Sequence, residues 1–106
     1  MKIVVQSGLI AGLVALCLQP VFAEGDAVAG RMKSDTCLGC HASPNIENVY
    51  PMYRVPKVGG QHAEYIMAAL KAYRDGLRPH MTMQANASSL SDQDIEDIAA
   101  FFSSQK

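Results

Sequence analysis

Two thiols and an imidazole stand within one short stretch of the chain, Cys37-Leu38-Gly39-Cys40-His41. This C-x-x-C-H spacing is that of covalent haem c attachment. The two cysteines can add to the two vinyl groups of one rigid ring, and the histidine is then held under the iron as an axial ligand. The rest of the chain must cover that ring. No other feature of the sequence constrains the fold as strongly.

Three other kinds of site use cysteine pairs, and the sequence disfavours each. A thioredoxin-like redox pair needs a βαβ frame, and the chain has no strand-like alternation. A zinc site needs four ligands; His62 and His80 could add to the two thiols, but no second C-x-x-C follows. A structural disulfide would leave His41 and the downstream methionines without a role. We therefore predict one covalently attached haem c.

The first residues have the pattern of a targeting segment. A positive start, Met1-Lys2, precedes the mostly apolar stretch 3–18, and short residues follow at 20–23. This order is typical of a secretory signal peptide with its cleavage site. We predict a cleaved signal peptide at residues 1–23 and one folded domain at residues 24–106.

Two alternatives assign the same segment differently. An uncleaved membrane anchor would need roughly 20 apolar residues, and Gln6 and Ser7 interrupt the stretch. A lipoprotein acylated on Cys17 would need a small residue before it, where this chain has Leu16. Cleavage would remove Cys17 and leave the two motif thiols in an oxidising compartment.

The chain is close to electrically neutral, with 9 Lys or Arg, 10 Asp or Glu and a net charge of −1. Such a balance favours neither nucleic acid nor an anionic membrane surface as a partner. A domain this small buries only a modest core. A large planar cofactor would become a substantial part of that core.

Hydrophobic spacing predicts an all-α domain with helices at residues 24–34, at 61–75 and from about Ser91 to the end. The middle helix has the clearest apolar stripe, which consists of Tyr65, Ile66, Ala69, Leu70 and Tyr73. Residues 42–60 and 76–89 are predicted to be irregular because they are rich in turn residues. A long irregular segment in a small domain is expected to wrap something.

The helix ends and one internal glycine carry further expectations. Ser91 and Asp94 form a variant of the capping box at the start of the last helix, and Gly76 suits the end of the middle one. Four acids lie in the first turns of the last helix, where negative charge is favourable: Asp92, Asp94, Glu96 and Asp97. Gly30 costs about 1 kcal/mol against Ala inside a helix, which suggests that another helix approaches closely. The first helix is expected to present an apolar side made of Ala27, Val28, Ala29 and Met32.

The iron of a haem has a second axial position, and its occupant decides the function. A strong ligand there leaves electron transfer, whereas an open position permits binding or catalysis. The downstream candidates are Met52, Met67, Met81, Met83, His62 and His80. We expect Met67 in the core, Met52 in loop packing and His62 at a helix start. The chemistry of the residues leaves His80, Met81 and Met83 open.

The chain resembles the small class I c-type cytochromes of bacterial periplasms, in particular the cytochrome c-553 type and single halves of the di-haem members. The resemblance covers nearly all of residues 24–106. The residues that carry it are Gly25-Asp26 with Gly30, the C-x-x-C-H motif, Pro56-Lys57-Val58-Gly59-Gly60-Gln61, and the ending from Leu90-Ser91-Asp92 through Ala99-Ala100-Phe101-Phe102.

The resemblance implies a cytochrome c-like fold of three to four short helices and loops wrapped around one haem, and it implies roles for single residues. Cys37 and Cys40 would form the thioethers, and His41 would be the proximal ligand. The carbonyl of Pro56 would accept the other ring N–H of that histidine. In the family the distal methionine lies seven residues before the leucine that precedes the last helix. Leu90 is that leucine here, so Met83 is the match, with Met81 the runner-up. Gly30 would lie where the first and last helices cross, against Phe101 or Phe102.

The implied function is that of a periplasmic monohaem cytochrome that carries single electrons and transforms no small-molecule substrate. Its partners would be redox proteins met transiently, with membrane contact only through their complexes. Two alternatives remain. One is a haem-bearing subunit of a periplasmic dehydrogenase or oxidase, and the other is a gas-binding cytochrome with an open sixth position.

Overall fold

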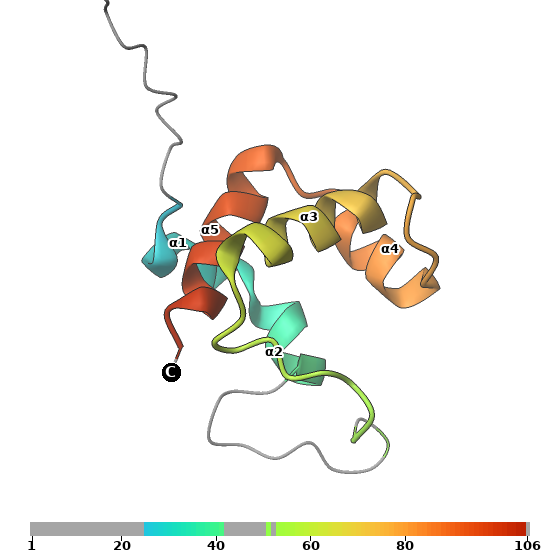
Figure 1. Ribbon diagram of the computed structural model, residues 1–106, viewed down its shortest axis with the longest axis horizontal. Helices are drawn as coiled ribbons and strands as arrows, with labels where there is room; N and C mark the ends of the chain where they lie inside the picture. The colour runs from blue at the N-terminus through green and yellow to red at the C-terminus, as the bar shows by residue number, and fades with distance from the viewer. Residues whose placement is uncertain (1–24, 42–50, 52, 106) are drawn as a thin grey trace, which may run out of the picture.

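The computed structural model describes residues 25–41, 51 and 53–105. These residues form five helices and no strand, and the order is α1 (Ala27–Lys33), α2 (Asp35–His41), α3 (Ala63–Arg74), α4 (Met81–Ala87) and α5 (Asp92–Ser103) (Figure 1). The predicted all-α class is confirmed. Three predictions concern residues outside this description: the signal peptide, Met52, and most of the expected loop at 42–60. None of the helices in the described ranges is long and apolar enough to span a membrane.

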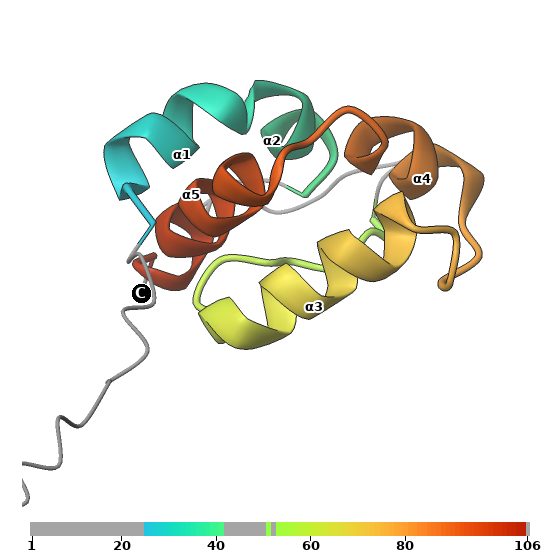
Figure 2. The same cartoon turned by 90° about the horizontal axis from the view of Figure 1, so that it is seen from above.

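The helix α1 crosses α5, and Figure 2 shows α5 between α1 and α3. Gly30 is buried at this crossing. A Cβ built on Gly30 would lie 1.9 Å from the carbonyl oxygen of Asp97 and 2.9 Å from the Cβ of Phe101. The two backbones touch because the glycine has no side chain. The predicted close approach of a second helix at Gly30 is therefore confirmed.

A buried carboxylate joins the same two helices. The side chain of Asp97 is only 4% exposed. Its Oδ1 accepts hydrogen bonds from the Asp26 amide at 2.8 Å and from Gln93 Nε2 at 2.9 Å, and Lys33 Nζ lies 2.6 Å from Oδ2. Lys33 also lies 2.8 Å from Asp94 Oδ1. The hydrogen bond from Lys33 is the main cause that lowers the pKa of Asp97, and the same lysine lowers the pKa of Asp94 to about 2.

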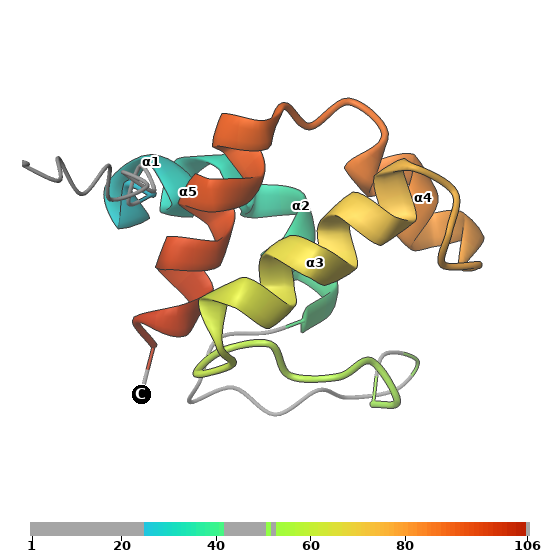
Figure 3. The ribbon, with the colours of Figure 1, turned by 45° about the horizontal axis from the view of Figure 1, so that its top comes forward.

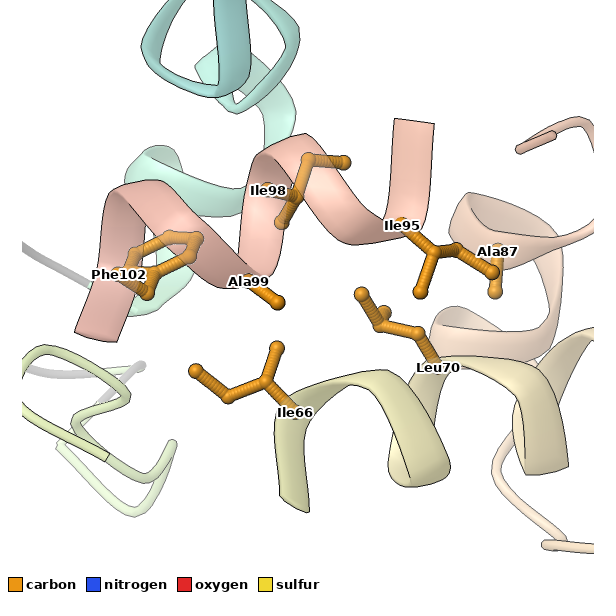
Figure 4. Packing of buried hydrophobic residues seen from close by; sticks show 7 residues of the cluster. All are labelled: Ile66, Leu70, Ala87, Ile95, Ile98, Ala99 and Phe102. Carbon is orange, nitrogen blue, oxygen red and sulfur yellow. The ribbon is translucent and has the colours of Figure 1, made fainter. Parts of the chain in front are cut away.

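The hydrophobic core lies where α5 meets α3 and α4 (Figure 4). Figure 4 shows Ile66 and Leu70 of α3 pointing toward α5, with Ala87 of α4 beside Ile95. The last helix contributes four buried residues at helical spacing: Ile95, Ile98, Ala99 and Phe102. Met67 packs partly buried against this core, as expected.

Two predicted helix ends are confirmed. The Ser91 side chain accepts from the Asp94 amide, and the Asp94 side chain accepts from the Ser91 amide, so the capping box is complete. Gly76 has a φ of 74° just after α3. A residue with a side chain adopts that left-handed conformation only at a cost. The glycine therefore ends this helix as the sequence predicted.

Two expectations were wrong, and one helix was not predicted. Residues 76–89 are not all irregular, because α4 occupies Met81–Ala87. The first helix does end at Ser34, its C-cap, but a second helix that was not predicted, α2, follows and contains the cysteine motif. Both extra helices have only seven residues, too few for a clear hydrophobic period. The apolar side expected for α1 is not buried, since Val28 and Met32 are each 75% exposed. The buried residue of that helix is instead Gly30, which lies against Asp97 and Phe101 of α5.

Candidate functional site

An apolar cavity of about 450 Å³ lies beside the core. Its walls come from α2, α3, α4, α5 and the segment before α3. The whole predicted stripe of α3 lines it: Tyr65, Ile66, Ala69, Leu70 and Tyr73. Val55, Pro56 and Val58 close another side, and Ile98 and Phe102 of α5 contribute to the wall. The stripe that looked like an ordinary core face therefore faces a space large enough for a ligand.

The cysteine motif forms part of the cavity wall. Cys37, Cys40 and His41 all line it from α2. Both thiols are free rather than joined in a disulfide. Burial raises the pKa of the Cys37 thiol, and a hydrogen bond with the Thr36 side chain partly offsets this effect. Within the described part of the chain no three His, Cys, Asp or Glu side chains group as a metal site. The zinc alternative with His62 and His80 therefore finds no support.

The imidazole of His41 contacts the backbone of the segment that precedes α3. Its Nδ1 lies 2.7 Å from the carbonyl oxygen of Pro56. A carbonyl can only accept, so Nδ1 carries the proton and donates it. The lone pair of the ring is therefore on Nε2. This is the arrangement in which a histidine binds a metal through Nε2 while a backbone carbonyl fixes its orientation.

The three candidates for the distal side differ in position. Met83, on α4, lines the cavity and packs partly buried against the core. Met81 is 87% exposed and does not line it. Successive residues of an α-helix are about 100° apart, so two methionines two positions apart face roughly opposite sides. His80 lines the cavity, and its Nδ1 accepts a hydrogen bond from the Met83 amide at 3.3 Å. Figure 3 shows α4 beside the end of α3.

Two arginines, Arg54 and Arg78, also line the cavity, and no sequence pattern had singled them out. The Arg78 guanidinium lies 4.9 Å from the centre of the Tyr73 ring, and its Nη1 is 3.4 Å from the Tyr65 hydroxyl. Arg54 lies 5.5 Å from the centre of the Tyr53 ring. Arginines in loops usually face water. Only their placement on two separate segments that meet at one cavity could have revealed them.

The described residues fit a covalently attached haem. The cavity is predominantly apolar, two free thiols stand at its wall at the required spacing, and an oriented imidazole lies next to them. A thioether sulfur, which is a soft ligand, reaches the same cavity from another helix. No single one of these features would be specific. Together they provide both attachment chemistry and iron ligands.

Comparison with known proteins agrees with this geometry. A family model described as cytochrome c matches residues 23–106. The chain belongs to the cytochrome c family. Its fold is accordingly the cytochrome c fold, its cofactor is covalently attached haem c, which the C-x-x-C-H motif fits, and it is a haem-based electron carrier.

The individual relatives are also cytochromes. The chain is 45% identical over 85 residues to cytochrome c-554(548) of Halomonas halodenitrificans. The matched region covers 77% of this chain and 99% of the relative. It is 37% identical over 105 residues to cytochrome c4 of Pseudomonas aeruginosa and 38% identical over 93 residues to that of Stutzerimonas stutzeri. The chain spans only 49% and 43% of these two proteins. The predicted resemblance to small class I cytochromes and to one half of longer ones is confirmed.

Proposed function

We propose that this protein is a periplasmic monohaem cytochrome whose iron is bound by His41 and Met83 and which passes single electrons between transient redox partners. Cys37 and Cys40 are the thioether attachment sites. The observation that carries the proposal is that Met83 lines the same cavity as Cys37, Cys40 and His41, whereas Met81 is 87% exposed.

The proximal side is supported by the contact of His41 with Pro56. Donation from Nδ1 to the Pro56 carbonyl at 2.7 Å fixes the plane of the ring and increases the basicity of Nε2. The haem iron supplies the one-electron chemistry. The chain would supply one iron ligand on each face of the haem and an apolar wall that excludes water. A methionine as the distal ligand favours the reduced state of the iron.

A second ligand from the protein leaves no coordination position for a substrate or a gas. Electron transfer through the haem edge is therefore the function that this ligand pair favours, and no small molecule is transformed. We further propose that residues 1–23 are a cleaved signal peptide and that membrane contact occurs only through partner complexes. Short-lived redox complexes of this kind use small interfaces.

The ligand assignment is tested with a matched pair of variants of the holoprotein. Met83→Ala should abolish the weak absorption near the red edge that sulfur-to-iron bonding gives to the oxidised protein. Met81→Ala removes a methionine two residues away on the same short helix and should leave this band unchanged. A band that survives in Met83→Ala and is lost in Met81→Ala would refute the assignment.

A further inference from the structure

We propose that His80 is a positioning residue for the distal ligand: it caps α4 through the amide of Met83 itself. The inference rests on the proposed ligand role of Met83. His80 is the N-cap of α4, with an extended backbone (φ −170°, ψ 106°), and its Nδ1 accepts from the Met83 amide at 3.3 Å. The methionine is the third residue of that helix. The cap therefore fixes the backbone of the one residue whose side chain must reach the iron.

Two contacts of His80 hold it in this role. Its carbonyl accepts the first helical hydrogen bond, from the Gln84 amide at 2.8 Å. Its ring meets the Tyr73 ring edge to face, with centroids 6.3 Å apart and an interplanar angle of 72°. Tyr73 belongs to the α3 stripe that lines the cavity. The start of α4 is thus tied through one imidazole to both its own third residue and the neighbouring cavity wall.

The same hydrogen bond argues against His80 as an iron ligand. Because Nδ1 accepts from an amide, its lone pair is already engaged. The ring proton is then on Nε2, the nitrogen that would otherwise coordinate. His80 therefore positions Met83 and does not compete with it for the iron.

A helix of seven residues depends strongly on such a cap. Isolated helices this short are unstable, because few hydrogen bonds offset the cost of nucleation. Removal of an N-cap side chain typically lowers the stability constant of the helix by a factor of about 2 to 30, which corresponds to ~0.5–2 kcal/mol. If α4 loosens, the Met83 sulfur leaves the iron more often, and an added ligand can replace it more easily.

The experiment measures the affinity of the oxidised holoprotein for added imidazole. Binding is monitored through the loss of the sulfur-to-iron absorption band. His80→Ala should raise this affinity about fivefold, the factor that corresponds to the typical loss of a cap, and by at most about 30-fold. His80→Asn should restore the affinity of the unmodified protein, because its Oδ1 stands as many bonds from Cα as the histidine Nδ1. Ser91→Ala removes the cap of α5 and serves as the control, with an expected affinity within about twofold of the unmodified protein. Amide hydrogen exchange at Met83 should become faster only in His80→Ala.

The outcomes separate this inference from the ligand assignment. If the band is lost in Met83→Ala but His80→Ala leaves imidazole affinity unchanged, His80 does not position the ligand and only this inference fails. The same conclusion follows if Ser91→Ala raises the affinity as much as His80→Ala, or if His80→Asn does not restore it. If the band survives in Met83→Ala, the proposed ligand itself is wrong and the positioning role falls with it.

Discussion

The crossing of α1 with α5 and the cavity between α2, α3 and α4 are built on different principles. At the crossing, the chain completes its own packing: the missing side chain of Gly30 lets the backbones touch, and Asp97 is satisfied by Lys33, Asp26 and Gln93. At the cavity, apolar side chains of several elements surround about 450 Å³ that they do not fill. The crossing is therefore stabilised by its own close contacts, whereas the cavity presents apolar side chains that a bound haem would cover.

The largest effect is expected from loss of haem attachment. In a Cys37→Ala, Cys40→Ala double variant the cavity wall would be left against water, and a small domain has little other buried apolar surface. We expect most of the helical circular dichroism to disappear. Gly39→Ala, which leaves both cysteines and meets no atom within 4 Å, should retain haem and helix content. A double variant as helical as the holoprotein would show that the crossing and the core hold the fold unaided.

The next effect concerns the crossing alone. In Gly30→Ala the new Cβ would lie 1.9 Å from the Asp97 carbonyl oxygen, so α1 and α5 must separate. We expect the free energy of unfolding of the holoprotein to fall by about 3 kcal/mol, the upper end of the usual cost of overpacking. Denaturant titration measures this change.

Gly39→Ala again provides the control for Gly30→Ala, since both are helical glycines. At the exposed, open position 39 alanine should raise the free energy of unfolding by about 0.5–1 kcal/mol. If both variants changed stability in the same direction by the same amount, helix propensity rather than close contact would explain the glycine at position 30.

The smallest effect is electrostatic and depends on pH. Lys33 lowers the pKa of Asp97 and brings that of Asp94 to about 2. A carboxyl whose pKa is lower in the folded than in the unfolded chain stabilises the fold above its unfolded pKa, near 4, and this contribution is lost as the pH falls toward 2. Lys33→Met should lower the free energy of unfolding at pH 7 and flatten its loss between pH 4 and 2.

Arg31→Gln is the matched control for the acid dependence. It removes an ion pair on the same helix, but the partner, Asp35, has a side chain that is 79% exposed. Exposed pairs contribute little to stability, so denaturation at several pH values should give the same slope as in the unmodified protein. If Lys33→Met and Arg31→Gln behaved alike, the buried network at the crossing would have no special role.

The features that the sequence could predict depend on local patterns. The stripe of α3, the capping box of Ser91 with Asp94 and the glycine that ends α3 each involve residues within about one to three helical turns. The cysteine motif is local too, and it predicted the cofactor that the family confirms. Even Gly30 was informative, because a helical glycine has a cost that some other contact must offset.

The features that could not be predicted from the sequence depend on residues far apart in the chain. Asp97 stood in a run of acids typical of a helix start, and its burial requires Lys33 and Asp26, which lie 64 and 71 residues away. The helix α4 is too short for a hydrophobic period to show. Because α4 was not predicted, the chemistry of the two methionines could not distinguish Met83, which lines the cavity, from Met81, which does not.

The most direct test of the central claim is the spectrum of the reduced holoprotein with and without carbon monoxide at neutral pH. If His41 and Met83 occupy both axial positions, the spectrum should change slowly or incompletely, while Met83→Ala should bind the gas readily. Fast and complete binding by the unmodified protein would contradict a closed iron, and with it the conclusion that this protein works as an electron carrier with a His/Met site.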